Sequence, residues 1–166
     1  MPFLRYLMLL SLIVWLGGLI FFSFVVAPTA FSVLPSRDLA GSVVSRSLTV
    51  LHWMGLVSGL VFLATSMLYA RLSSGSAHPL AVRHLLIVAM LVLTAISQFG
   101  ISPKMAALRA SLGEIDNAPV SDPARVQFNA LHLWSTRLEI GVFLLGLMVA
   151  YLTASQFEVG PGRPTF

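Results

Sequence analysis

The sequence predicts an all-α integral membrane protein, folded as a bundle of four spanning helices. Of its 166 residues, 57% are hydrophobic and only 10% are charged, and the mean hydropathy is +0.91. Soluble domains average about 25% charged residues, and the deficit here extends along the whole chain. The third observation is that four apolar runs come near the ~20 residues that a helix needs to cross ~30 Å of hydrocarbon.

The spans are expected at residues 6–27, 50–70, 80–101 and 130–154. The first run is too long for the apolar core of a signal peptide, and Pro28 disfavours cleavage after Ala27, so we interpret it as a mature span. Four spans place both ends of the chain and the turn from Arg71 to Pro79 on one side of the membrane, here called side A. The two longer connections lie on the opposite side, side B.

Both connections on side B carry signals for further helix. Ser36 is a suitable N-cap for a helix over residues 36–49 that runs into the second span. Asp122 followed by Pro123 begins another helix over residues 123–129 that runs into the fourth. Apolar residues three and four apart continue the third span as an amphipathic helix over residues 103–115. All of these pieces are assigned to one transmembrane domain, residues 1–166.

The two halves of the chain resemble each other, which predicts two parallel repeats of a helical hairpin. Leu51-His52 opens the second span and Leu131-His132 opens the fourth, while Pro28 and Pro103 each follow the preceding span. Units of two spans repeat in parallel about an axis along the membrane normal. The alternative is chance similarity between apolar segments. In a genuine repeat, the two histidines lie at equivalent depths.

Composition and charge exclude several classes of function. The absence of cysteine excludes disulfide scaffolds, thiolate metal sites, iron–sulfur clusters, covalent c-type haem and cysteine nucleophiles. The ten Lys and Arg residues, which give a net charge of +4, are scattered without a basic run, so nucleic-acid binding is not predicted. Motifs of a nucleophile elbow, a phosphate loop or a zinc-protease helix are also missing, and nothing in the sequence predicts an enzyme.

The basic residues give only a slight preference for orientation. Side A carries Arg5, Arg71, Arg83 and Arg163, whereas side B carries Arg37, Arg46, Lys104, Arg109, Arg125 and Arg137. By the positive-inside rule, this excess slightly favours side B as the inside. A multi-pass protein of this kind is expected in the inner or plasma membrane.

Ionisable residues inside spans are costly in hydrocarbon, so each is a candidate functional residue. In the fourth span, His132, Ser135 and Glu139 share one helical face with Thr136. His52 opens the second span, where small residues at the spacing of Gly55 and Gly59 allow close helix approach. A polar core inside the bundle is predicted to contain Ser97, Gln98, Ser135 and Arg137.

Two inward-facing histidines suggest a bound cofactor. The second and fourth spans both enter from side B and lie diagonally across an up-and-down bundle, so His52 and His132 can approach one ion or iron porphyrin from opposite sides. Neutral imidazole suits copper, zinc and iron alike. Glu139 lies roughly 10 Å deeper than His132 along the helix, where it can bind the metal, orient a ligand or accept a proton. The predicted cofactor is haem b or a transition-metal ion.

Structural roles are the alternatives for the same residues. Each of the two histidines, beside Trp53 or Trp134, can be an amphipathic anchor at the membrane interface. Glu139 can form a buried pair with Arg137 that holds the helices in register, although Arg137 is also long enough to extend to side B. His78 and His84 lie at the side A boundary and are expected to contact lipid headgroups only.

The chain resembles a known family at dispersed positions. The resemblance depends on Leu34-Pro35, Arg46, Leu51-His52, Gly55, Ser102-Pro103, Phe128, His132, Ser135, Glu139 and Gly141. This pattern, between Trp15 and about Tyr151, resembles the transmembrane protein 205-like family, a domain of unknown function, and implies four membrane helices. The chain has Glu139 where the family pattern can have Asn, and Ser102 where it can have Glu.

The stretch from Trp15 to Phe21 is more remotely similar to the first span of copper-resistance D proteins and of HemJ-type protoporphyrinogen oxidases. Both groups are small bundles with intramembrane histidines around metal or haem. That similarity implies a ligand role for His52 and His132.

Three functions are therefore carried forward. The first is a membrane protein that binds haem b or a transition metal through His52 and His132. The second is a small-molecule or ion transport or tolerance factor, in which Glu139 and Arg137 line a solute path. The third is a structural subunit of a larger membrane complex. The expected partners are the lipid bilayer and either further copies of the chain or a partner membrane protein.

Overall fold

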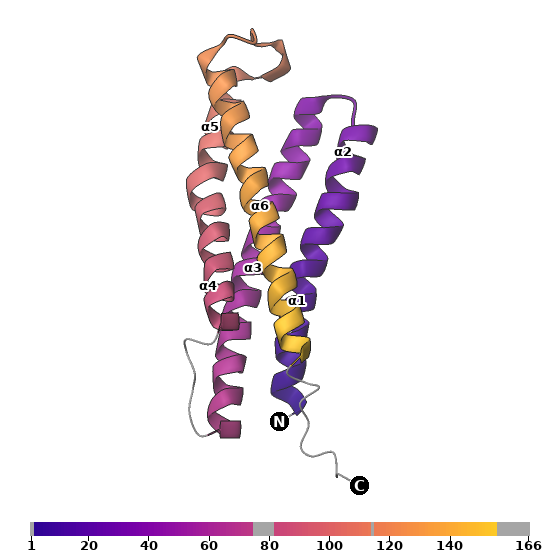
Figure 1. The fold of residues 1–166 in the computed structure, drawn as a ribbon. Helices are drawn as coiled ribbons and strands as arrows, with labels where there is room; N and C mark the ends of the chain where they lie inside the picture. Colours follow the sequence, from indigo (N-terminus) through magenta and orange to yellow (C-terminus); the bar gives the residue numbers. More distant parts are fainter. Residues whose placement is uncertain (1, 75–81, 114, 156–166) are drawn as a thin grey trace.

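A computed structural model, which describes residues 2–74, 82–113 and 115–155, has four long apolar helical columns. The first column joins α1 (Pro2–Phe21), the π-helical segment η1 (Phe22–Val26) and α2 (Ala27–Val33), and the second is α3 (Arg37–Ser74). The third joins α4 (Val82–Ala95), a second π-helical segment η2 (Ile96–Ile101) and α5 (Ser102–Leu112). After the short 3-10 turn η3 (Ile115–Asn117), α6 (Pro123–Ser155) forms the fourth (Figure 1). The all-α four-helix membrane bundle is confirmed, and the chain is a multi-pass membrane protein.

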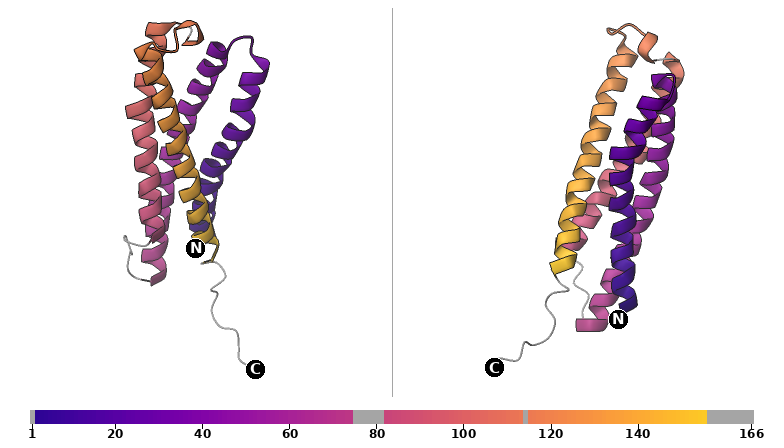
Figure 2. Two further views of the ribbon diagram at one scale, coloured as in Figure 1. Left: turned by 45° about the horizontal axis from the view of Figure 1, so that its top comes forward. Right: turned by 90° about the vertical axis from the view of Figure 1, so that its right-hand side faces the viewer.

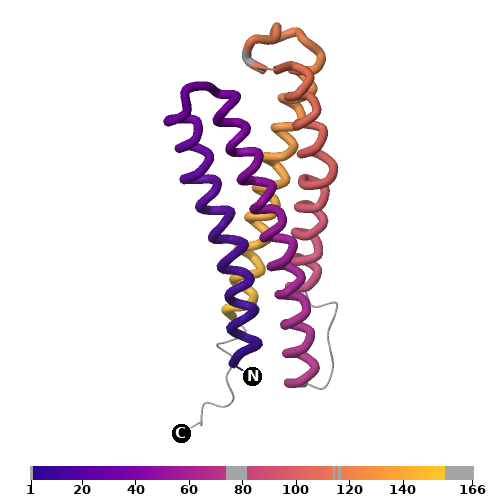
Figure 3. The backbone as a smooth tube through the Cα atoms, turned by 180° about the vertical axis from the view of Figure 1, so that it is seen from behind, coloured from indigo at the N-terminus to yellow at the C-terminus, as the bar shows by residue number. Residues whose placement is uncertain are grey.

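The columns form two hairpins that converge at one end and diverge at the other. The first hairpin is α1–η1–α2 with α3, and the second is α4–η2–α5 with α6. Figures 1 and 2 show α1 beginning and α6 ending at the same end of the bundle, side A, where the hairpins lie close together. Seen from behind, the hairpins separate toward side B (Figure 3). The backbones of the two hairpins are therefore further apart at side B than at side A.

The predicted helix starts on side B are present. The backbone N–H of Leu39 donates to Ser36 Oγ at 3.2 Å, which satisfies one of the free amides at the start of α3. Asp122 Oδ1 accepts from the backbone N–H of Ala124 at 2.8 Å and of Arg125 at 3.4 Å at the start of α6. α3 therefore begins at Arg37 and α6 at Pro123.

The first connection on side B differs from the prediction, because Pro28 does not end the first column. The helix continues to Val33 after a π-helical turn in which the N–H of Ala27 bonds to Phe22 O, five residues back. The second half repeats this arrangement, since Ser102 N–H bonds to Ser97 O just before Pro103. A wider turn accommodates a proline that lacks an N–H. Each hairpin therefore has a π-helical turn just before a proline in its first column.

Tight packing near side A holds the hairpins together. The core contains Trp15, Phe62, Ile87, Met90 and Val149, each at most 2% exposed. Trp15 lies against two glycines of α3: a Cβ at Gly55 would be 2.4 Å from Trp15 Nε1, and one at Gly59 2.7 Å from Trp15 Cζ3. The large indole therefore fits only because side chains are missing opposite it, which is the close approach that the glycine spacing predicted.

His84 differs from the sequence prediction of a headgroup contact. It is only 3% exposed, and its Nε2 lies 2.7 Å from Ser66 Oγ on α3. The neighbouring Arg83 is also buried, at 8% exposure. Both side chains pack between α3 and the start of α4 because that start lies inside the bundle. His78 lies outside the described residues.

Candidate functional site

A buried polar cluster joins three of the four columns midway along the bundle. His52 on α3 is 2% exposed, and its Nε2 lies 2.6 Å from Glu139 Oε1 on α6. Its Nδ1 lies 2.8 Å from Gln98 Oε1 on η2. Ser97 Oγ also donates to Glu139 Oε1, at 3.4 Å. Four residues that the sequence singled out separately are thus brought into one network.

The hydrogen-bond inventory of this cluster determines how it is held. A carboxylate accepts, so the Nε2–H of His52 donates to Glu139. Gln98 can serve the other ring nitrogen as acceptor or, with its amide turned over, as donor, because the oxygen and nitrogen of an amide are told apart only by their partners. Both nitrogens of His52 are therefore occupied by protein groups.

The position of η2 explains why Ser97 and Gln98 both reach the cluster. In a regular α-helix, neighbouring residues diverge by about 100° around the axis. The π-helical turn locally widens the backbone, and Ser97 is fully buried while Gln98 is partly buried. Such turns are frequent at functional sites, and the sequence signal for this one is Pro103 downstream.

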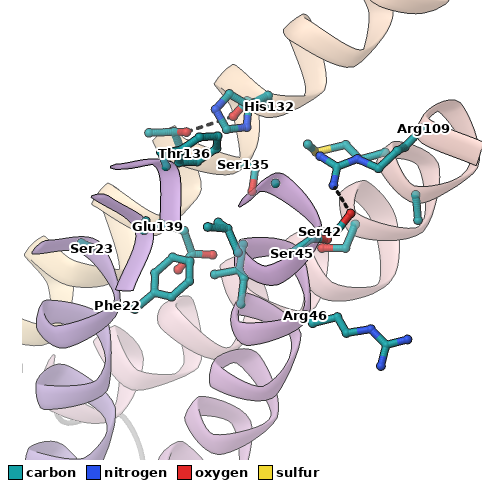
Figure 4. Close-up of a pocket in the computed structure, with 18 of the residues that line it drawn as sticks. Phe22, Ser23, Ser42, Ser45, Arg46, Arg109, His132, Ser135, Thr136 and Glu139 are labelled. Carbon is teal, nitrogen blue, oxygen red and sulfur yellow. Dashed lines mark hydrogen bonds between the residues drawn. The ribbon is translucent and has the colours of Figure 1, made fainter. Parts of the chain in front are cut away.

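A cavity of about 960 Å³ opens between the two hairpins on the side B half of the bundle. Apolar side chains from both hairpins supply most of its wall, with Phe22, Leu48, Phe128 and Phe143 among them. Glu139 and Ser135 of α6 also line it, and Figure 4 shows both side chains directed into the space. The carboxylate of the buried cluster therefore reaches the cavity as well.

Arg109 crosses the mouth of the cavity and links the hairpins. Its Nη1 donates to Ser42 Oγ on α3 at 3.1 Å (Figure 4), and its Nε lies 3.9 Å from Asp38 Oδ1. On its other side, the guanidinium stacks 5.6 Å from the ring centroid of Phe128. A Cβ at Gly41 would lie 2.6 Å from Arg109 Nη2, so this glycine leaves room for the guanidinium. The sequence predicts the helix that carries Arg109 but holds no signal for these contacts, here called the Arg109 clasp.

His132 and Arg137 lie apart from the buried cluster. His132 is exposed on the cavity wall, where its ring stacks on Phe128 with a centroid distance of 6.5 Å. Arg137 is exposed and stacks over Trp134 at 5.3 Å. The buried partner of Glu139 is His52 rather than Arg137.

Metal ligands are not gathered in the part of the chain that the structure describes. No group of three or more His, Asp or Glu side chains there is placed to hold an ion. Of the predicted ligands His52, His132 and Glu139, the structure brings together His52 and Glu139 at 2.6 Å.

One family model, for a domain of unknown function called DUF4149, matches residues 10–114. The chain belongs to the DUF4149 family. The matched part of this DUF4149 protein holds His52, Ser97 and Gln98, whereas Glu139 and His132 lie beyond it. No curated protein and no solved structure matches the chain.

Proposed function

We propose that this DUF4149 protein binds a small amphipathic molecule in the cavity between its hairpins and acts in its transport or in tolerance to it. The observation that carries the proposal is a cavity of about 960 Å³ with mainly apolar walls and one carboxylate directed into it. Ligand sites are typically clefts of roughly 300–1,000 Å³ with a few convergent polar groups. Glu139, held by His52, is that polar group.

The walls of the cavity suggest how such a molecule enters. Phe24 on the first hairpin and Ile140 on the second line the cavity and are 72% and 53% exposed. In a bilayer these exposed edges face hydrocarbon, because both lie on spanning helices. An amphipathic solute can therefore pass from the lipid into the cavity without first crossing water.

The absence of cysteine allows a direct test of this cavity. Ser135→Cys introduces one thiol on the cavity wall, and Thr153→Cys introduces one in the packed end of α6, where Thr153 is 1% exposed. A small water-soluble methanethiosulfonate should label the first variant rapidly and the second slowly. Added amphipathic solutes should slow labelling of Ser135→Cys. Equal, slow labelling of both thiols would contradict an open cavity.

Haem b or transition-metal binding through His52 and His132 is a competing proposal that the geometry supports less well. Both ring nitrogens of His52 contact protein groups, so His52 would bind iron or another metal only if Gln98 or Glu139 withdrew. The remote similarity to copper-resistance D and HemJ-type bundles is the support for this proposal. An optical spectrum and an elemental analysis of protein from supplemented cells decide it: a Soret band or one equivalent of metal favours the cofactor.

The finer assignments of family, location and assembly are also proposals. We propose a place near the transmembrane protein 205-like proteins, supported by residues such as Leu51-His52 and Ser102-Pro103, which fall within the DUF4149 match. A location in the inner or plasma membrane, with side B inside, follows from the slight excess of basic residues there.

A role as a structural subunit predicts a stable complex with a second membrane protein, which cross-linking in native membranes would reveal.

A further inference from the structure

Glu139 presents one oxygen to the buried cluster and leaves the other for the cavity. The contacts from His52 and Ser97 both fall on Oε1. The side chain is 15% exposed and lines the cavity, so the carboxylate is not sealed in the core. Within the described residues, Oε2 has no hydrogen-bond partner among those recorded for this carboxylate. We infer that the cavity binds an organic cation whose charged group lies against Oε2 of Glu139, an inference that rests on the proposed function.

Among the described residues, three arginines line the cavity, and the first of them, Arg37, is exposed at the start of α3. Arg109 faces Asp38 and Ser42 and stacks on Phe128. Figure 4 shows the guanidinium of Arg46 extending away from the other lining side chains. Near Glu139, the lining residues are Phe22, Ser135 and Phe143, which carry no charge. At the inner end of the cavity, the basic neighbour of Glu139 is therefore His52, which contacts Oε1 from the buried side and leaves Oε2 toward the cavity.

Aromatic side chains next to Glu139 favour a cation over a neutral solute. Phe22 lies beside Glu139 in Figure 4, and Phe143, four residues along α6, lies on the same face of that helix as Glu139. A cation over an aromatic face gains about 0.5–2 kcal/mol, more when both are removed from water. The ring faces and the carboxylate together suit a substituted ammonium or phosphonium group.

The size and donor set of the site disfavour an inorganic ion. Calcium and magnesium bind six or more oxygen ligands, whereas this cavity is lined by a few hydroxyls and two carboxylates, of which Asp38 faces Arg109. A space of about 960 Å³ with apolar walls also leaves a bare ion largely without partners. An organic cation fills the apolar space and needs only one opposite charge.

Two ions of nearly the same shape and opposite charge provide the test. Tetraphenylphosphonium is a lipophilic cation and tetraphenylborate is its anionic counterpart. Equilibrium dialysis of the purified protein in detergent should show saturable binding of tetraphenylphosphonium and only micelle partitioning of tetraphenylborate. Comparable saturable binding of the anion, or binding of the anion alone, would overturn the inference.

Variants at Glu139 distinguish the effect of removing the negative charge from the effect of disturbing the fold. Glu139→Gln should weaken tetraphenylphosphonium binding by about tenfold or more, as expected for loss of one charge-assisted contact, whereas Glu139→Asp should retain most of it. Asp122→Asn is the matched control, because it removes an acid outside the cavity and keeps a good helix cap. Unchanged binding in Glu139→Gln would refute a role for the carboxylate.

The same preparations distinguish this inference from the proposed function. If Ser135→Cys is labelled and protected by solutes but tetraphenylphosphonium does not bind, the proposed cavity stands and the inference that its ligand is a cation is wrong. If Ser135→Cys reacts no faster than Thr153→Cys and neither ion binds, both proposals fail. Thermal unfolding of Glu139→Gln and Glu139→Asp identifies a variant that has lost its fold, and Glu139→Asp then carries the comparison with the wild type.

Discussion

His52 shows how one polar side chain can tie a membrane bundle together. Its ring contacts α6 through Glu139 and η2 through Gln98, so a single residue of α3 joins both columns of the opposite hairpin. In hydrocarbon, water is not available to replace such partners, and unsatisfied groups are costly. The contacts therefore both hold the hairpins in register and fix the direction of the Glu139 carboxylate.

Replacing His52 should destabilise the bundle. His52→Ala leaves Gln98 and Glu139 without their shared partner, and we expect a loss of about 1–3 kcal/mol of unfolding free energy. Unfolding in mixed micelles at increasing sodium dodecyl sulfate measures this loss. His132→Ala is the control, because His132 is exposed and should change stability by less than about 0.5 kcal/mol. Equal effects at the two positions would contradict a special role for the buried histidine.

The residues of this cluster could be predicted from the sequence, but not their pairing. His52, Ser97, Gln98 and Glu139 were each identifiable as polar groups inside apolar runs, because hydrocarbon makes such groups conspicuous. The choice of His52 over Arg137 as partner of Glu139 depends on the rotation of α6 and on the depth of α3 within the bundle. A shift of one residue along a helix rotates the side-chain direction by about 100° around the axis. Spacing in the sequence alone therefore could not decide between His52 and Arg137.

At the scale of elements, glycine positions set the distance between α1 and α3. Gly55 faces the buried Trp15 at a separation that excludes a Cβ, whereas nothing lies within 4 Å of a Cβ at Gly17 on α1. Helices in membranes gain stability from such close packing, since burial from lipid adds little. The contact between the two helices therefore depends on which glycine faces the partner.

Gly55→Ala should separate the two helices. The added methyl group would lie 2.4 Å from Trp15 Nε1, and a buried indole with neighbours on all sides has little room to move. Overpacking of this kind typically costs about 1–3 kcal/mol. Gly17→Ala should leave stability unchanged or raise it slightly, because the site is open. Thermal unfolding in one detergent compares the two variants, and an equal loss would refute the packing argument.

The Arg109 clasp couples the hairpins at their divergent end. It joins α5 to α3 through Ser42 and Asp38 and to α6 through Phe128. Exposed ion pairs alone contribute only about 0–1 kcal/mol, so the clasp restricts the width of the cavity mouth more than it stabilises the fold. Its contacts would have to break for the hairpins to move further apart.

Arg109→Ala should widen the distribution of distances across the mouth without unfolding the protein. Spin labels on cysteines at Leu39 of α3 and Ala107 of α5, both exposed, report this distance by double electron–electron resonance. The matched control is Lys104→Ala, which removes an exposed charge from the same helix. A distribution identical in the wild type and in Arg109→Ala would show that the clasp does not hold the mouth.

At the scale of the whole molecule, the sequence predicted the membrane location and the order of the four helices far better than the shape of the bundle interior. Hydropathy alone identifies the four helical columns, because apolar runs of this length are typical of transmembrane helices. The divergence of the hairpins toward side B was not predictable, because it results from many contacts between residues distant in the chain. Trp15 packs closely against the glycines of α3, whereas toward side B the hairpins diverge and are linked by Arg109 of α5 to Ser42 and Asp38 of α3.

This asymmetry predicts one-sided access in a sealed membrane. A charged thiol reagent that cannot cross the bilayer should label Ser135→Cys only from the side on which it labels Val120→Cys, which lies 78% exposed in the side B connection. Thr153→Cys should stay unreactive from either side, because this position is packed near side A and is 1% exposed. A protein that only binds its solute keeps this pattern when tetraphenylphosphonium is added. One that transports it must open toward side A as well, so labelling of Thr153→Cys should then rise from that side, and constant labelling would restrict the function to binding.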